Sequence, residues 1–207
     1  EWVNESVKHS LKRLGIPRLR GLLLHSSQQL LGPQGKELYK SMIALKEQGK
    51  IEKIGVSIYS PDELDVLWPL YQFDIVQAPF NILDRRLDTS GWLIRLHMAG
   101  VEVHTRSAFL QGLLLMKATE RPDEFKRWHS LWGQWDQWLE NNNLSPLQAC
   151  LGFVMSQKEI DRVVFGVNSL KQLKEILAND YDFSLEMPNI LMSDDLDLIN
   201  PSRWSLL

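Results

Sequence analysis

The stretch "RGLLLHSS" (residues 20–27) decides the fold, because an apolar run ends there in a histidine and two serines. Strands that are apolar throughout, without alternation, are typical of a parallel sheet buried on both faces. His25 therefore stands at the end of a predicted strand. Two interpretations are open: a core or rim histidine that finds a hydrogen-bond partner, or a ring at the mouth of a site.

The same pattern recurs along the chain. Further predicted strands are "IEKIGVSIYS" (51–60), "FDIVQAPFNIL" (73–83), "VEVHTRSAF" (101–109) and "DRVVFGV" (161–167). Helical spacing of apolar residues lies between them, as in "SLKQLKEILAN" (169–179). About five strands, each followed by a helix, predict an α/β fold, either a barrel or a doubly wound sheet. No GxGxxG follows a strand, so the Rossmann fingerprint is absent.

Polar residues follow the end of every predicted strand. They are His25 and Ser26, Ser57 and Tyr59, Gln77 and Asn81, Arg106 and Ser107, and Asn168 and Ser169. In a (β/α)8 barrel the carboxyl ends of all strands lie on the one face where the active site is built. The sequence therefore predicts a single polar face.

The composition is that of an ordinary globular domain, with 207 residues, 44% hydrophobic residues and a net charge of −3. No basic stripe appears, which indicates no nucleic-acid partner. Cys150 is the only cysteine, so a disulfide framework is excluded and a cytoplasmic location is expected. No apolar run reaches the ~18 residues of a membrane span, and we expect no membrane partner.

Several motifs occur in one order along the chain: "LLLH" (22–25), "KIGVS" (53–57), "DIVQAPFN" (74–81), "RSAFLQGLL" (106–114) and "VVFGVNSLKQLKEIL" (163–177). Together with "LINPSRW" (198–204) they make the chain resemble the aldo-keto reductase family over nearly its whole length. The resemblance implies a (β/α)8 TIM-barrel type of fold that transfers hydride between a nicotinamide cofactor and a carbonyl. It also implies an incomplete barrel that begins at the third helix and supplies strands four to eight.

The resemblance divides the chain simply. Residues 1–207 are expected to form a single barrel domain whose first three strands are absent, with residues 181–207 as a C-terminal tail packed on it. His25 matches the catalytic histidine, which orients and polarises the substrate carbonyl. The family's proton-donating tyrosine, its aspartate and its lysine are expected upstream of residue 1. The 207-residue chain alone is therefore expected to be inactive.

The resemblance also assigns cofactor-binding residues. Ser57 and Gln77 match the residues that hold the nicotinamide carboxamide, and Arg106 takes the place of a stacking aromatic ring. Residues of two later loops match the pyrophosphate and adenosine contacts: Ser107, Phe109, Gln111, Gly166, Asn168, Ser169, Lys171, Gln172 and Glu175. The implied cofactor is NADP(H), which Lys171 favours slightly, or NAD(H).

Some positions depart from the family pattern, and others are weaker candidates for a role in the site. Ile58 and Ile176 replace common asparagines, which removes hydrogen bonds to the cofactor. Asn81 and Arg85 are candidate contacts of a small carbonyl substrate, although each could serve only as a strand-end or surface polar group. The histidines show no metal-binding spacing, so no metal is expected.

Two functional hypotheses follow. The first is an NAD(P)H-dependent oxidoreductase that reduces an aldehyde or ketone to an alcohol. The second is a non-catalytic cofactor-binding, regulatory or interaction protein on a degenerate aldo-keto reductase fold. Five strands cannot close an eight-stranded barrel, so the exposed sheet edges predict self-association.

Overall fold

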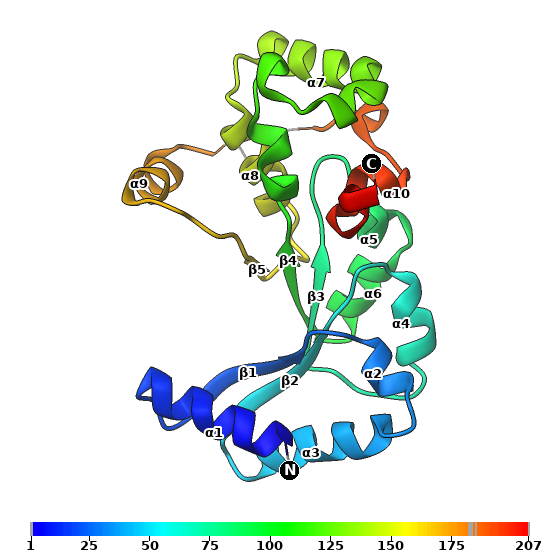
Figure 1. Ribbon diagram of the computed structural model, residues 1–207, viewed down its shortest axis with the longest axis vertical. Helices are drawn as coiled ribbons and strands as arrows, with labels where there is room; N and C mark the ends of the chain where they lie inside the picture. The colour runs from blue at the N-terminus through cyan, green and yellow to red at the C-terminus, as the bar shows by residue number, and fades with distance from the viewer. Residues whose placement is uncertain (1, 182–183, 185, 207) are drawn as a thin grey trace. The chain divides into compact units, whose positions relative to one another are not determined.

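The computed structural model describes residues 2–181, 184 and 186–206. Within these residues five parallel strands form one open sheet in the order β1-β2-β3-β4-β5 (Figure 1). The strands are β1 (Leu19–Leu24), β2 (Ile51–Ser57), β3 (Ile75–Pro79), β4 (Glu102–Arg106) and β5 (Arg162–Val163). The prediction of an α/β fold with parallel strands is confirmed.

Each strand is followed by at least one helix. The α-helices are α1 (Trp2–Leu14), α2 (Gln28–Leu31), α3 (Gly35–Glu47), α4 (Asp62–Leu67), α5 (Arg86–Thr89), α6 (Trp92–Met98), α7 (His129–Asn142), α8 (Pro146–Met155), α9 (Leu170–Ala178) and α10 (Leu196–Ile199). Short 3-10 helices are η1 (Leu110–Leu115), η2 (Ala118–Glu120), η3 (Asp123–Trp128), η4 (Asn189–Leu191) and η5 (Pro201–Leu206). None of the helices in the described ranges is long and apolar enough to cross a membrane.

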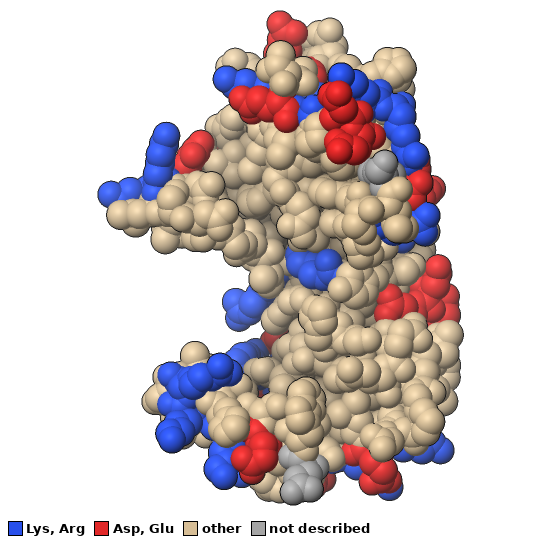
Figure 2. All heavy atoms as spheres, viewed as in Figure 1, with Lys and Arg blue, Asp and Glu red and all other residues tan. Residues whose placement is uncertain are grey.

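The chain divides into two compact units. The first comprises residues 1–78 and 92–104, and the second comprises residues 79–91 and 105–207. Both basic and acidic side chains occur on each unit in the view of Figure 2. The expected single domain over 1–207 stays a prediction.

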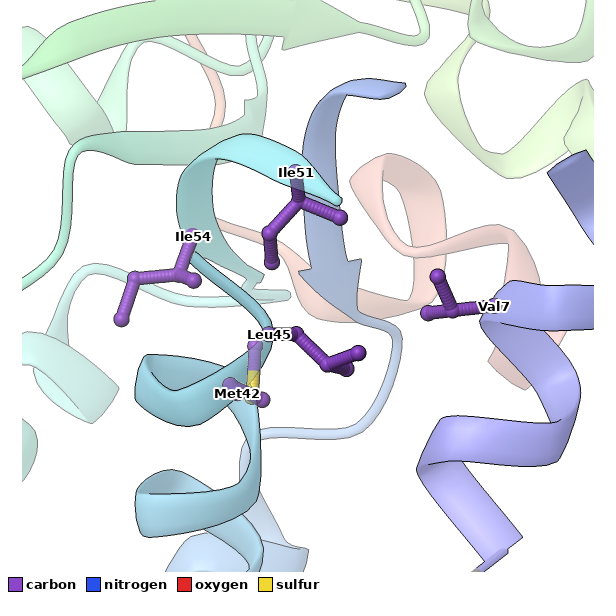
Figure 3. Close-up of a cluster of buried hydrophobic side chains, with 5 residues drawn as sticks. All are labelled: Val7, Met42, Leu45, Ile51 and Ile54. Carbon is purple, nitrogen blue, oxygen red and sulfur yellow. The ribbon is translucent and has the colours of Figure 1, made fainter. Parts of the chain in front are cut away.

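The core of the first unit forms where α1 and α3 pack against β2. Val7, Met42, Leu45, Ile51 and Ile54 are each 1% exposed and lie together (Figure 3). Val7 comes from α1, while Met42 and Leu45 are three residues apart on one face of α3. Burial of each such side chain contributes about 1.5–3 kcal/mol before entropy is counted.

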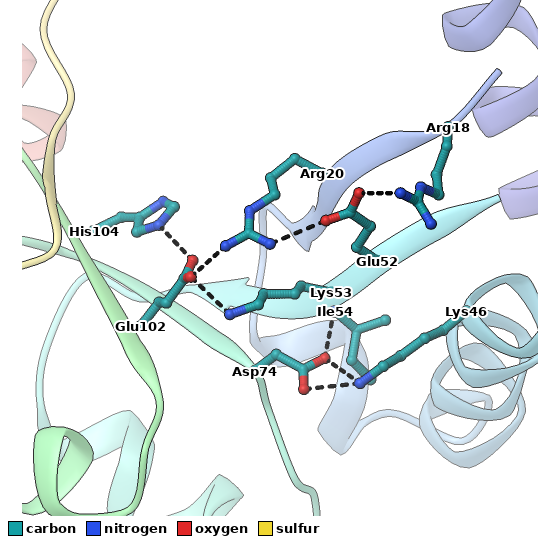
Figure 4. Close-up of polar contacts among 9 residues, drawn as sticks. All are labelled: Arg18, Arg20, Lys46, Glu52, Lys53, Ile54, Asp74, Glu102 and His104. Carbon is teal, nitrogen blue, oxygen red and sulfur yellow. Dashed lines mark hydrogen bonds and ion pairs between the residues drawn. The ribbon is translucent and has the colours of Figure 1, made fainter. Parts of the chain in front are cut away.

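A network of charged side chains joins β1, β2 and β4 in the same unit (Figure 4). One carboxylate oxygen of Glu102 lies 2.6 Å from Nη2 of Arg20 and 2.6 Å from Nζ of Lys53. The other carboxylate oxygen lies 3.3 Å from Nε2 of His104. β1 and β4 are not neighbours in the sheet, so the Arg20–Glu102 pair indicates a sheet that curves toward these side chains.

The core of the second unit is built around α8. Five of its side chains are almost fully buried: Ala149, Cys150, Leu151, Phe153 and Val154. The ring of Phe153 stacks on Phe80 with centroids 5.4 Å apart. A helix with apolar residues on all sides is typical of the centre of a protein.

The C-terminal residues that the structure describes pack on the second unit. Leu191, Leu198 and Ile199 are buried, and the Ser193 N–H donates to the Leu83 carbonyl at 2.9 Å. Residues 182, 183, 185 and 207 of the expected tail lie outside the described residues.

Candidate functional site

His25 lies directly after β1, as the sequence predicts. Its side chain is exposed, and the imidazole makes no hydrogen bond to any other residue that the structure describes. The exposed side chain rules out a core position, and the choice between a rim histidine and a ring at the mouth of a site stays a prediction. An exposed ring at the end of a strand is accessible to a ligand.

Ser57, the last residue of β2, and Gln77, the middle residue of β3, lie side by side. The two residues are register partners, and the Ser57 hydroxyl donates to the Gln77 side-chain oxygen at 3.3 Å. Ser57 is 4% exposed. The first unit thus brings together the two residues predicted to bind the nicotinamide carboxamide. The next residue, Ile58, is fully buried, and its N–H donates to the Gln77 carbonyl at 2.8 Å.

Glu63 links the loops that follow β1 and β2. One of its oxygens accepts the N–H groups of Tyr59 and Ser60, at 2.7 Å and 2.8 Å, and the other accepts the hydroxyl of Ser27. The spacing of Ser60 and Glu63 in the sequence predicts a capping box. The Glu63 half of it forms, but the Ser60 hydroxyl donates to Asp62 at 3.2 Å and α4 (Asp62–Leu67) has no side-chain N-cap bond. The contact to Ser27 could not be predicted, because 36 residues separate the two partners.

The second unit contains a cavity of about 730 Å³. Its walls come from the loop after β4, the start of α8, the loop after β5 and α9. Eight residues predicted to bind the cofactor line it: Arg106, Ser107, Phe109, Gln111, Gly166, Asn168, Gln172 and Glu175. Ser169 and Lys171 belong to the same segment without lining the cavity.

The loop after β4 has a strained backbone. Ser107, Leu110 and Gln111 have φ values of 63°, 46° and 55°, in the left-handed region that favours glycine. Each such residue costs roughly 1–2 kcal/mol relative to an ordinary conformation. Strain of this kind clusters at ligand sites and persists where the surroundings hold it.

Two helix N-termini border the cavity. α9 follows its N-cap Ser169, whose hydroxyl accepts the Gln172 N–H at 3.2 Å. α8 follows Ser145, which forms a capping box with Gln148. The sequence did not predict that the start of α8 belongs to the site. The capping residues Ser145 and Gln148 show where the helix begins, but not that its N-terminus faces the cavity. Helix N-termini and the Arg106 guanidinium all favour an anion.

Arg85 lies in the second unit, close to the C-terminal segment. It is 6% exposed, and burial lowers the pKa of its guanidinium. It donates to the carbonyls of Ile82, Met187 and Pro188 at 2.9–3.2 Å, and it lies 4.9 Å from the ring centroid of Phe153. These contacts attach residues 187–188 to the turn after β3. A substrate contact by Arg85 stays a prediction.

Asn81 is the other candidate substrate contact, and it is fully buried. Its carboxamide makes its hydrogen bonds to backbone groups of the second unit. Among the described residues no three His, Cys, Asp or Glu side chains come together in a way that could hold a metal ion.

The family model described as the Aldo/keto reductase family matches residues 1–186. The chain belongs to this family. The NADH-specific methylglyoxal reductase of Escherichia coli strain K12 is 26% identical over 194 residues, which cover 86% of this chain and 59% of that protein. The L-glyceraldehyde 3-phosphate reductase of Escherichia coli O157:H7 is 25% identical over 212 residues, which cover 90% of this chain and 61% of that protein.

Solved aldo-keto reductases have the same fold. The holo form of an aldo-keto reductase from Bacillus halodurans gives a TM-score of 0.70 at 22% identity, over 90% of this chain and 64% of that structure. The TIM-barrel type of fold that the sequence predicts is thereby confirmed. This chain spans about three fifths of the length of the curated aldo-keto reductases that it matches.

Aldo-keto reductases use nicotinamide cofactors, and the described residues fit such a group. The cavity volume falls in the range of about 300–1,000 Å³ that is usual for ligand sites. The two helix N-termini suit a pyrophosphate, and the Glu175 carboxylate can accept hydrogen bonds from sugar hydroxyls. The planar guanidinium of Arg106 can stack on a ring. In the first unit, the Ser57 hydroxyl and the Gln77 carboxamide can pair with another carboxamide.

Proposed function

We propose that this protein is an NAD(P)H-dependent reductase that converts an aldehyde or ketone carbonyl into an alcohol. The observation that carries the proposal is the gathering of eight expected cofactor contacts around one cavity of the second unit. Membership of the aldo-keto reductase family supports the reaction class. The bound cofactor would supply the hydride.

The residues of this chain take separate roles in the proposal. In the second unit the phosphates and the adenosine end are bound by Ser107, Phe109, Gln111, Gly166, Asn168, Gln172 and Glu175, together with Ser169 and Lys171. Arg106 stacks on the nicotinamide ring in this proposal. In the first unit Ser57 and Gln77 bind the carboxamide, and the exposed His25 orients and polarises the substrate carbonyl.

Reduction of a carbonyl also needs a proton. None of the four tyrosines of this chain matches the family's proton donor, and three of them hold their hydroxyl protons in hydrogen bonds. The hydroxyls of Tyr39, Tyr71 and Tyr181 donate to the backbone carbonyls of Gln72, Leu30 and Ile176. A general acid contributes about 10²–10⁴-fold to a rate. We therefore propose that the 207 residues alone bind the cofactor without efficient turnover.

The substrate is a small carbonyl compound in this proposal. Methylglyoxal and glyceraldehyde 3-phosphate stand in the names of two relatives, so both are the first compounds to test. For the cofactor, Lys171 favours NADP(H), whereas one relative is named NADH-specific. A cytoplasmic location is proposed from the lone, buried Cys150.

The test is consumption of NADPH and NADH by the protein in the presence of each aldehyde, followed by nicotinamide absorbance. The 207 residues alone are expected to bind the cofactor without efficient oxidation. In a protein that also contains the family's upstream residues, the expected result is saturable oxidation that falls at least tenfold in a His25→Ala variant, with His9→Ala on α1 as the matched control. A protein that contains the family's upstream residues and oxidises neither cofactor contradicts the proposal.

A second candidate is a non-catalytic cofactor-binding protein on the same fold. Ile58 favours it, because this position is fully buried and apolar where the family pattern has an asparagine. This candidate requires cofactor binding without oxidation of either cofactor by any aldehyde. It is excluded if turnover is observed.

A further inference from the structure

The side chain of Asn81 closes the turn that follows β3. Its oxygen accepts the N–H groups of Leu83 and Asp84, at 2.9 Å and 3.0 Å. The Asn81 N–H also donates to the Asp84 carbonyl at 3.0 Å. The two bonds to its oxygen and the lack of exposure to solvent hold the carboxamide in one orientation, and the backbone bond fixes the turn on which it stands.

The same carboxamide reaches the loop after β4. Its nitrogen donates to the carbonyl of Ser107 at 3.1 Å. Ser107 is the first residue after β4, and its φ of 63° places it in the left-handed region. The Ser107 carbonyl also accepts the Leu110 N–H at 2.9 Å, so this oxygen anchors the turn that begins the loop.

We propose that Asn81 is a positioning residue that holds Ser107 in its left-handed conformation and so shapes the segment 106–112 for the cofactor phosphates. The ligand in this inference, the dinucleotide, rests on the proposed function. The hydrogen bond between Asn81 and Ser107 does not. A strained backbone persists only where neighbouring groups fix it, and a buried donor on a rigid turn is such a group. Asn81 thereby acts on the cofactor through Ser107, without touching it.

Two variants remove the donor while they keep the turn. Asn81→Asp retains the oxygen that accepts from Leu83 and Asp84, and Asn81→Ser retains a shorter acceptor that cannot reach Ser107. Each is expected to weaken dinucleotide binding about tenfold, the usual effect of one lost buried hydrogen bond. The matched control is Asp195→Ala, which removes a helix cap of the same unit away from the cavity lining.

Ser107→Gly separates positioning from general stability. Glycine adopts a positive φ without a steric cost, so the left-handed conformation at position 107 should depend less on the hydrogen bond from Asn81. In the Ser107→Gly background, the loss caused by Asn81→Asp or Asn81→Ser is expected to shrink to threefold or less, as judged by a double-mutant cycle. An equal loss in both backgrounds, or no loss in either variant, overturns the inference.

Hydrogen exchange gives a measurement that needs no cofactor. The amides of Leu110 and Gly112, which donate to the carbonyls of Ser107 and Phe109, are expected to exchange faster in both Asn81 variants and unchanged in Asp195→Ala. If the wild-type protein binds no dinucleotide, the proposed function fails, and this exchange alone decides on Asn81. Unchanged exchange at both amides then overturns the positioning role.

Discussion

The Ser57 hydroxyl, at the end of β2, lies 3.3 Å from the side-chain oxygen of Gln77, its register partner on β3. The two side chains hold each other in place. If they bind the cofactor carboxamide, Ser57→Ala removes one donor and releases the Gln77 side chain. We expect cofactor affinity to fall about tenfold, measured by fluorescence titration. Ser41→Ala on α3 is the control and should bind normally. A Ser57→Ala variant with wild-type affinity would remove Ser57 from the site.

Glu63 is half-buried and should contribute measurably to stability. Glu63→Gln weakens the charge-assisted bonds to Ser27, Tyr59 and Ser60. We expect the free energy of unfolding to fall by about 1–2 kcal/mol in urea denaturation. Glu37→Gln, whose partner is the exposed Lys40, should change it by less than about 0.5 kcal/mol. Equal effects of both substitutions on the free energy of unfolding would show that the hydrogen bond from Ser27 to Glu63 does not stabilise the protein.

The network around Glu102 predicts sensitivity to acid. The hydrogen bond from Lys53, with the charges of Lys53 and Arg20, holds the pKa of Glu102 below its ordinary value of 4.5. A lowered pKa in the folded state stabilises the protein above the ordinary pKa, and this stabilisation disappears as the pH falls through the lowered value. The difference in unfolding free energy between wild type and Glu102→Gln should therefore be largest near neutral pH and shrink below about pH 4.5. Urea denaturation over this range measures it, and a difference independent of pH would contradict it.

Lys171 is exposed on the first turn of α9 and is proposed to meet the 2′-phosphate of NADP(H). Lys171→Ala should weaken NADPH binding about threefold and leave NADH binding unchanged, because an exposed ion pair contributes only a modest energy. Lys174→Ala on the same helix is the matched control. Equal losses for both cofactors would mean that Lys171 does not contact a 2′-phosphate.

Much of the sheet could be predicted from the sequence, because apolar runs mark the strands, although no residue of β1 is fully buried. β2 to β4 lie inside the expected stretches and β1 begins one residue before its stretch, whereas the expected strand at 161–167 forms β5 only over Arg162–Val163. Residues 164–167 line the cavity instead, and their backbone bond is the one from the Val164 N–H to Thr105. The apolar pattern of the sequence does not show that β5 ends at Val163, because it carries no sign that the next residues line a cavity.

The site was less predictable than the fold. Local signals found His25 at a strand end and Ser169 as a helix cap. The contacts of Asn81 and Arg85 could not be found, because their partners lie 26 and 102 or more residues away in the chain. A polar residue after a strand looks the same in the sequence whether it faces a ligand or a neighbouring backbone.

The central claim is that this protein binds a nicotinamide dinucleotide with the residues named above. The most direct test compares hydrogen exchange of the protein with and without NADPH or NADH, at concentrations fixed by a fluorescence titration. We predict saturable binding, with slower exchange in residues 106–112 and 164–176. Absence of saturable binding, or binding that leaves exchange in both segments unchanged, would contradict it.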